Sequence, residues 1–172
     1  MTITLYDISS TIPGAAWSPN VYKTRMALNY KGLEYKTEWV EYPDIGPLAK
    51  KIGALPTSIG ATRELYTVPI IHDHATGKVA SDSFAIAQYL DETYPDQPKL
   101  FPAGPGIAAI FDSYWMQHPI PALSKIVQPT IFRRLNTASH EFPGREYLDA
   151  NWRSLLRRVR TERMVGAKFT RV

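Results

Sequence analysis

Cysteine is absent from the sequence. Its absence excludes a cysteine nucleophile, a Cys-x-x-Cys redox pair, disulfide bonds and thiolate metal sites. The chain also lacks any apolar run approaching the roughly 18 residues of a transmembrane helix, and its first residues lack the basic-then-apolar layout of a signal peptide. We therefore expect a soluble, cytoplasmic protein with no membrane partner.

Positive charge is scarce in the first part of the chain and concentrated in the remainder. Residues 1–100 carry 9 Lys and Arg against 11 Asp and Glu, whereas residues 101–172 carry 11 against 5. A basic tail is one signature of nucleic-acid binding. Here the arginines alternate with apolar residues at helical spacing, and the tail has no zinc-finger, RNP-like or heptad pattern. The pattern favours a solvated helix face, so we expect no nucleic-acid partner.

The chain begins with the pattern of a β-α-β unit. Residues 3–8 are β-branched and predict a strand, and residues 9–17 predict a loop. A helix is expected from Pro19 to about Lys31, and residues 35–42 have the period-two alternation of a half-buried strand. A strand, a helix and a second strand with short connections predict two parallel strands with a right-handed crossover.

The next segment contains a short helix and then a hairpin. We expect a helix over residues 47–52 ending at Gly53, and an exposed loop over residues 56–62. Strands are predicted for residues 66–72 and 78–80, with a turn between them. The antiparallel hairpin is followed by a helix that we expect to run from residue 83 to residue 94.

The remainder of the chain has a different composition. Residues 96–106 are rich in proline and glycine and are expected to form a linker between a first domain (1–95) and a helical one (107–172). Within the helical part, proline is expected to kink or break the chain at positions 119, 121 and 129. A last helix is expected after Gly144, on the apolar pattern of Leu148, Trp152, Leu155 and Val159.

The start of the first helix carries a candidate anion site. Ser18 is a preferred N-cap residue, and Pro19 suits the first helical position because its missing N–H costs nothing there. Such a helix end presents unpaired N–H groups and the positive end of the helix dipole. Ser18 is therefore either a plain cap or the hydroxyl of an anion-binding site.

Two motifs give the chain a resemblance to a known family. Tyr66-Thr67-Val68-Pro69 places a proline at the start of a strand, and Asp82-Ser83 opens the next helix, followed by Phe84-Ala85-Ile86-Ala87. Together with the preceding β-α-β unit, they resemble the glutathione transferase family. The run Ser18–Arg25, with Trp39–Ile45, resembles its fungal etherase-like class, which is related to bacterial enzymes that cleave β-aryl ethers with glutathione.

The resemblance implies a two-domain fold. We expect an α/β thioredoxin-like N-terminal domain, in the order βαβ-α-ββα with a mixed four-stranded sheet, followed by an all-α C-terminal domain. That second domain is shorter here than in the family, and no Ser/Thr-x-x-Asp capping box appears after Arg145. We therefore expect an incomplete substrate pocket and exposed apolar helix faces.

The resemblance also implies glutathione as co-substrate and a set of residues that hold it. The backbone of Val68, before a cis Pro69, would pair with the cysteinyl part, as an added strand does. Asp82 would meet the γ-glutamyl ammonium, and Ser83 the γ-glutamyl carboxylate. Lys51 would meet the glycine carboxylate, with Lys50 as the alternative cation. The remaining expected contacts come from Trp17 and Asn20, beside the first helix start.

Catalysis in this family requires an ionised thiol, because the thiolate is the nucleophile. Lowering a thiol pKa by about two units requires about 2.7 kcal/mol. A hydrogen bond from Ser18 to the charged sulfur supplies roughly 1.5–3 kcal/mol, and the helix end adds about 0.3–1 kcal/mol. The resemblance implies Ser18 as the catalytic residue, without a general base or a metal. Tyr6, Ser9, Ser10 and Thr11 stay open as alternative donors.

The expected function is a glutathione transferase that attacks a small hydrophobic or aromatic electrophile, with aryl-ether cleavage as the class-specific version. Its electrophile would lie against Ser10, Thr11, Ile12, Tyr114 and Trp115, although the aromatic residues could equally be core. The alternative is a non-catalytic glutathione- or ligand-binding protein with an incomplete pocket. A homodimer is the expected assembly.

Overall fold

The computed structural model describes residues 3–59 and 64–140. At its centre is a four-stranded sheet in the order β2-β1-β5-β6. The strands are β1 (Ile3–Ile8), β2 (Tyr35–Val40), β5 (Ile70–Asp73) and β6 (Lys78–Ser81). β1 runs parallel to β2 and antiparallel to β5, which is antiparallel to β6. The predicted mixed sheet of a thioredoxin-like domain is confirmed.

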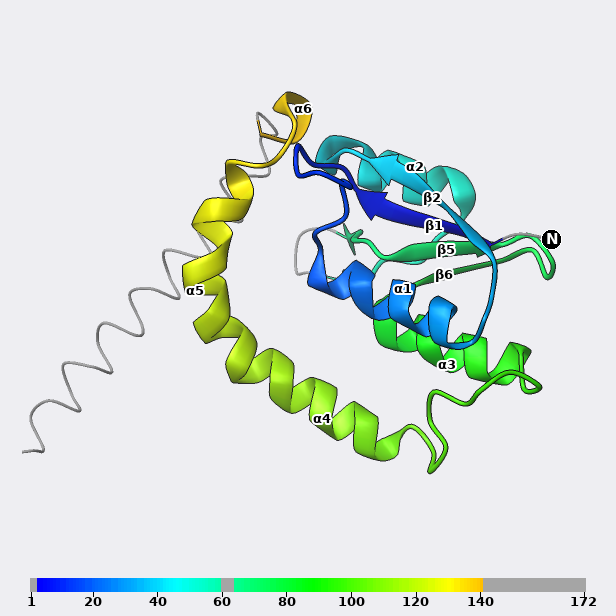
Figure 1. Ribbon diagram of the computed structural model, residues 1–172. Helices are drawn as coiled ribbons and strands as arrows, with labels where there is room; N and C mark the ends of the chain where they lie inside the picture. The colour runs from blue at the N-terminus through cyan, green and yellow to red at the C-terminus, as the bar shows by residue number, and fades with distance from the viewer. Residues whose placement is uncertain (1–2, 60–63, 141–172) are drawn as a thin grey trace, which may run out of the picture.

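Helices cover both faces of this sheet. α1 (Pro19–Tyr30) and α3 (Ser83–Thr93) lie together on one face, and α2 (Ile45–Ile52) lies on the other (Figure 1). A 3-10 turn, η1 (Tyr42–Asp44), joins β2 to α2. The first helix ends where the sequence predicts it, since Gly32 takes a φ of 67°, a conformation that favours glycine.

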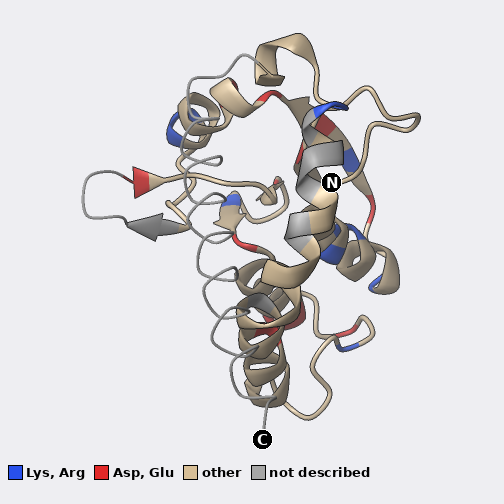
Figure 2. Ribbon diagram, turned by 90° about the vertical axis from the view of Figure 1, so that its left-hand side faces the viewer, with Lys and Arg blue, Asp and Glu red and all other residues tan. Residues whose placement is uncertain are grey.

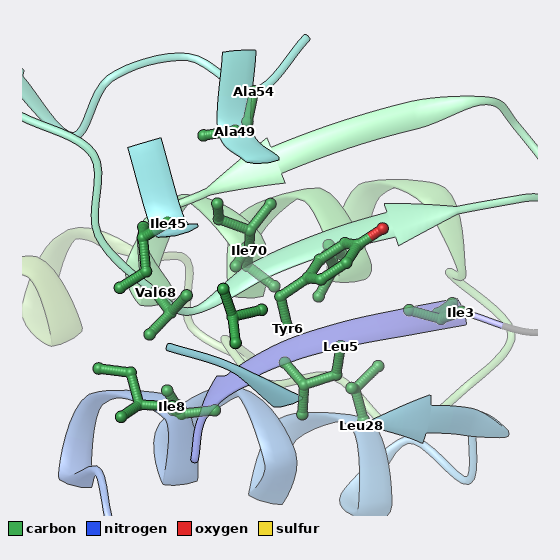
Figure 3. Close-up of a cluster of buried hydrophobic side chains, with 14 of the residues drawn as sticks. Ile3, Leu5, Tyr6, Ile8, Leu28, Ile45, Ala49, Ala54, Val68 and Ile70 are labelled. Atoms are coloured by element: carbon green, nitrogen blue, oxygen red, sulfur yellow. The ribbon is translucent and has the colours of Figure 1, made fainter. Parts of the chain in front are cut away.

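The core forms because successive side chains of β1 point to opposite faces. Leu5 packs toward Leu28 of α1, and Tyr6 points to the other side, with Ile70 and the α2 residue Ile45 (Figure 3). All six residues of β1 are buried, as expected for a strand with a neighbour on each edge. Burying each such side chain contributes about 1.5–3 kcal/mol relative to exposure.

Two strand predictions are corrected by the structure. The strand expected from residue 66 begins only at Ile70, because Pro69 has no N–H to donate to the ladder. The exposed loop expected over residues 56–62 contains β3 (Ser58–Ile59), which pairs with β4 (Glu64–Leu65). Ladders of two residues are too short to show an alternating pattern. The helix expected from residue 47 starts at Ile45.

The second part of the chain contains α4 (Gly106–Gln117), α5 (Pro119–Phe132) and α6 (Thr137–His140). Pro119 separates α4 from α5, as predicted. Pro121 does not break α5, because it lies in the first turn, where its missing N–H has no intrahelical partner. α5 also continues through position 129, so of the kink or break expected there the break does not occur. The last predicted helix lies outside the described residues.

Large apolar side chains are exposed on α4. Ile107, Ile110 and Phe111 expose 76%, 73% and 62% of their surface. Such a run on one helix exceeds the scattered apolar exposure that is normal for soluble domains. Acidic and basic residues are interspersed over the described elements, as Figure 2 shows, whereas most of the basic tail lies outside them.

Candidate functional site

Three loops converge at one end of the sheet. In the strand register Tyr6 lies opposite Ile70, and Ile70 lies opposite Ser81. The residues that follow β1, precede β5 and follow β6 must therefore meet at the same edge. In Figure 1, the start of α1, the start of β5 and the start of α3 all lie at the left-hand end of the sheet. This edge carries Ser18, Val68 and Asp82.

Ser18 is the N-cap of α1, as predicted. Its backbone is extended, with φ −68° and ψ 119°, and its hydroxyl oxygen accepts a hydrogen bond from the Val21 N–H over 3.5 Å. The carbonyl of Ser18 begins the helix by accepting from the Tyr22 N–H at 2.9 Å. The residue is 8% exposed, so its hydroxyl sits in a partly desolvated place at the positive end of the helix dipole.

Val68 lies beside the end of β1. Its side chain is buried next to Ile8 (Figure 3), and the Val68–Pro69 peptide bond is cis, as the resemblance implied. The β1–β5 pairing begins only at Ile70, so the backbone N–H and C=O of Val68 are not committed to that ladder. A peptide-like ligand could pair with them.

Asp82 is the N-cap of α3 and has an unusual backbone. Its φ of 75° is rarely adopted by residues with a Cβ, and such conformations concentrate at functional sites. Asp82 Oδ1 accepts hydrogen bonds from the N–H groups of Phe84 and Ala85, at 2.9 and 3.1 Å. The side chain is exposed, and Ser83 follows it, half-buried, as the first residue of α3. The predicted helix start is confirmed.

The two candidate lysines differ in their surroundings. Lys51 is exposed in the last turn of α2. The ammonium of Lys50 lies 5.6 Å from the centre of the Tyr66 ring, in the segment that leads to Val68. Lys50 is therefore the cation with a demonstrated contact to that segment.

Trp17 and Asn20 flank the cap. Trp17 is half-buried against the core, and its indole nitrogen is buried without a hydrogen-bond partner among the described residues. Asn20 is exposed in the first turn of α1. Both residues therefore lie next to Ser18 in the chain, one facing inward and one facing solvent.

The alternative thiol donors are engaged elsewhere. Ser9 Oγ accepts a hydrogen bond from Asn136, at 2.8 Å. The hydroxyl of Ser10 donates to the Ala15 carbonyl at 2.8 Å and also accepts from the Ile12 N–H. The Thr11 hydroxyl donates to the carbonyl of residue 134, at 3.0 Å. Ser10 and Thr11 therefore donate their hydroxyl protons elsewhere, whereas Ser9 only accepts. Ser18 differs from all three in standing at a helix start, which suits an anion.

Tyr6 is the remaining rival, and it is poorly placed. Its side chain is 5% exposed and points to the sheet face that α2 covers, away from α1 (Figure 3). Burial, together with the nearby Glu38 carboxylate, raises the pKa of Tyr6. The phenol is therefore harder to ionise than usual.

The expected aromatic walls are not joined to the loop 9–17. Tyr114 and Trp115 are 57% and 36% exposed on α4. Their ring neighbours, His118 for Tyr114 and Phe111 for Trp115, belong to the same stretch of chain. Within the described residues, neither side chain forms a hydrogen bond, ion pair or ring contact with that loop. The sequence analysis assigned these two aromatic residues to the electrophile site only because of the family resemblance.

One ion pair ties α4 to the first domain. Lys23 Nζ lies 2.8 Å from Asp112 Oδ1, and this ion pair joins α1 to α4. Both side chains are about one-third exposed, so solvent screens much of their attraction. The pair therefore aligns the helices more than it stabilises them.

Sequence reasoning missed a polar network behind the loop. The carboxylate of Glu41 accepts hydrogen bonds from Asn136 and Ser139, which follow α5. No local motif signals this network, because Glu41 is more than 90 residues away in the chain from both Asn136 and Ser139. Only the tertiary structure brings them together.

Two features are absent from residues 3–59 and 64–140, a metal-binding cluster and a membrane-spanning helix. Across these ranges no group of three or more His, Asp or Glu residues is arranged to hold a metal ion. No helix in the same ranges has both the length and the apolar character needed to cross a membrane.

The comparisons with known proteins agree with the geometry. Residues 17–93 match the family described as glutathione S-transferase, N-terminal domain. Residues 17–93 form a glutathione S-transferase N-terminal domain. The chain is 38% identical over 165 residues to the glutathione S-transferase-like protein ustS of Aspergillus flavus, covering 91% of this chain and 54% of that protein.

Two solved fungal glutathione S-transferases are also similar. One, from Ceriporiopsis subvermispora in complex with glutathione, is 46% identical with a TM-score of 0.83, over 88% of this chain and 60% of that one. The other, GSTFuA3 from Phanerochaete chrysosporium, is 41% identical with a TM-score of 0.76, over 91% and 62%. The chain thus spans between half and two-thirds of the length of these relatives. The etherase-like class stays a prediction.

Proposed function

We propose that this chain binds glutathione at the sheet edge that carries Ser18, Val68 and Asp82. One observation carries the proposal: the strand register brings a capped helix start, a strand start with uncommitted backbone groups and an acidic helix cap to one edge. These are the groups that a tripeptide with a thiol, an ammonium and two carboxylates requires. The fungal relative solved with glutathione supports the assignment.

Each part of glutathione has a matching group. The backbone of Val68 pairs with the cysteinyl unit. Asp82 Oδ2 receives the γ-glutamyl ammonium, because Oδ1 is used in capping α3. The N-terminus of α3, with Ser83, receives the γ-glutamyl carboxylate. Lys51, at the end of α2, receives the glycine carboxylate. Trp17 and Asn20 close the site around the cap of α1.

Ser18 activates the thiol in this proposal. Its hydroxyl donates a hydrogen bond to the sulfur, and that bond strengthens when the sulfur becomes negative. The dipole of α1 acts in the same direction. The thiol proton leaves to solvent, so no histidine or other base is needed. The thiolate then attacks an electrophilic carbon of a small hydrophobic or aromatic molecule, and the C–S bond forms as the leaving group departs with its bonding electron pair. For an aryl ether, the class-specific candidate, the C–O bond breaks and the leaving group is the phenolate.

The electrophile would approach over the loop that holds Ser10, Thr11 and Ile12, with Tyr114 and Trp115 of α4 as aromatic walls. Support comes from the exposure of these rings, which leaves their faces available for an apolar molecule. The Lys23–Asp112 pair holds α4 next to the first turns of α1.

A second candidate function is a non-catalytic glutathione- or ligand-binding protein. It is favoured by one observation, namely that within the described residues Tyr114 and Trp115 form their ring contacts with α4 and His118 and none with the loop before Ser18. In that case, the thiol half of the site would work while the electrophile half would not.

A homodimer is the assembly that we propose. The exposed apolar side chains of α4 would be shielded if two copies associated. Light scattering after gel filtration measures the mass directly. A mass of one chain at micromolar concentration contradicts the dimer without affecting the glutathione site.

Glutathione binding is tested by calorimetry and thermal unfolding on the full chain. We expect a rise in melting temperature with millimolar glutathione, because a ligand that binds the native state stabilises it. Glutathione disulfide and the free amino acids serve as controls. Conjugation of glutathione to an aryl halide then separates the two functions: binding without turnover supports the second candidate, and absence of binding contradicts both.

A further inference from the structure

The segment after α5, residues 133–139, reaches back to the loop that follows β1, and we call it the return segment. Thr11 donates twice to the carbonyl of Arg134, from its N–H at 2.7 Å and from its hydroxyl at 3.0 Å. Asn136 Nδ2 donates to Ser9 Oγ at 2.8 Å. Figure 1 shows α6 lying beside the end of β1 at the same end of the sheet as the start of α1.

The return segment is itself anchored to the first domain by Glu41. Asn136 Nδ2 donates to Glu41 Oε1 at 2.7 Å, and the Ser139 hydroxyl donates to Glu41 Oε2. Ser139 Oγ in turn accepts from the Tyr42 N–H at 2.9 Å. Ser139 and Leu135 are 4% and 6% exposed, and Leu135 joins the hydrophobic core. A carboxylate that receives two side-chain donors in a partly buried place holds them in fixed positions.

The loop between β1 and α1 also has hydrogen bonds of its own, from the Ala15 N–H to the Ile12 carbonyl at 2.8 Å and from the Ala16 N–H to the Gly14 carbonyl at 2.7 Å. It contains no regular helix or strand from residue 9 to residue 18. The Ser9 N–H donates to the Val40 carbonyl at 3.1 Å, and Ser10 forms a bond within the loop. The bonds from the return segment hold the first residues of this loop, Ser9 and Thr11, against a distant part of the chain.

We propose that the return segment positions Ser18 for glutathione, with Asn136 as the positioning residue. Asn136 bonds both the loop, through Ser9, and the anchor, through Glu41, with a single amide group. It does not touch the ligand in this proposal. It keeps the start of the loop in register with β2, so that the helix start carrying Ser18 faces the sulfur. A part of the second domain thereby becomes necessary for the chemistry of the first.

This inference rests on the proposed function and is tested through the pKa of the bound thiol. The ultraviolet absorbance of the thiolate is titrated in the complex of the full chain with glutathione. In Asn136→Ala we expect the thiol pKa to rise by about one unit, a tenfold loss of thiolate at acidic pH. Glutathione affinity should change much less, since the residues that hold the rest of the tripeptide are untouched.

A matched control is available on α4. Gln117 forms a comparable amide hydrogen bond, from Nε2 to Ser113 Oγ at 2.8 Å, but does not contact the loop. Gln117→Ala should leave the thiol pKa unchanged. Ser139→Thr retains the hydroxyl donor to Glu41 and should also retain the wild-type pKa, whereas Ser139→Ala should raise it.

The outcomes separate the inference from the proposed function. If wild-type protein shows no thiolate on binding glutathione, the proposed role of Ser18 is wrong. If wild-type protein shows it and Asn136→Ala has the same thiol pKa, the positioning role is wrong. Should Asn136→Ala fail to fold, Ser139→Ala gives the same decision, and loss of stability with an unchanged thiol pKa would assign these residues a structural role alone.

Discussion

The ammonium of Lys31 is completely buried and lies 2.8 Å from Asp91 Oδ1. Lys31 follows the last residue of α1, and Asp91 belongs to α3, so the pair joins the two helices on that face of the sheet. Lys31 also donates to the Pro98 carbonyl at 3.1 Å. Burial alone would raise the pKa of the Asp91 carboxyl. Its pKa nevertheless lies below the usual value, because the carboxylate accepts hydrogen bonds from the Leu100 N–H, Lys31 and the Phe101 N–H.

Removing Asp91 should destabilise the fold strongly. Asp91→Ala leaves a buried ammonium without its carboxylate, and breaking such a pair costs about 3–5 kcal/mol. Urea unfolding monitored by tryptophan fluorescence gives the free energy of unfolding. Lys36→Met is the control, because the Lys36–Glu38 pair is about half exposed and should contribute at most about 1 kcal/mol. Equal effects of the two substitutions would contradict the structural role of Lys31.

Substitutions of Ser18 should separate helix capping from catalysis. Ser18→Ala should lower kcat for an aryl halide by about 10²–10³, the usual effect of losing one donor to a developing charge. Ser18→Asp keeps a capping oxygen but donates nothing to a thiolate, and it should be equally inactive. Ser18→Thr keeps both roles and should remain active. Unchanged turnover in Ser18→Ala would transfer the role to another donor.

The charge of Asp82 should matter for affinity. Asn tolerates a positive φ and can still cap α3, so Asp82→Asn removes little but the negative charge. A hydrogen bond to a charged group contributes about 1.5–3 kcal/mol, so we expect the dissociation constant for glutathione to rise at least about tenfold. A glutathione analogue without the amino group should bind wild-type and variant protein equally. Asp96→Asn, at an exposed position, is the control.

The glycine carboxylate should distinguish the two lysines. Lys51→Ala should weaken glutathione binding by about two- to fivefold, since exposed ion pairs contribute up to about 1 kcal/mol. The glycine ethyl ester of glutathione should show no such difference between variant and wild type. The same pattern in Lys50→Ala, with none in Lys51→Ala, would assign the carboxylate to the lysine beside Tyr66.

Stability should fall at alkaline pH through Tyr42. Burial raises the pKa of Tyr42 to about 12, above its ordinary value of 10.0. A raised pKa in the folded state means that this stabilisation is complete below pH 10 and is lost as the pH rises to about 12, by up to about 2–3 kcal/mol. Tyr42→Phe should show a smaller loss in urea unfolding over that range, whereas Tyr30→Phe, at an exposed position, should not.

Local chemistry made most of the first domain predictable. Ser18 and Asp82 are helix caps because their short oxygen-bearing side chains satisfy N–H groups within three residues. Gly53 ends α2 because a φ of 75° favours glycine. The short connections account for the parallel β1–β2 pair and the β5–β6 hairpin, whereas the pairing of β5 with β1 joins strands more than 60 residues apart. The missed β3–β4 pair lacked any such signal, since it has only two residues in each strand.

The sequence by itself determined the helix caps at Ser18 and Asp82 and the end of α1 before Gly32, because these depend on residues within a few positions. The tertiary structure alone decided that the hydroxyls of Ser9 and Thr11 are hydrogen-bonded, because their partners are more than 120 residues away in the chain. It likewise decided that Tyr6 points toward α2 and that Asn136 bridges Ser9 and Glu41. Local periodicity reports only on neighbours in the chain, whereas these contacts depend on how the return segment packs.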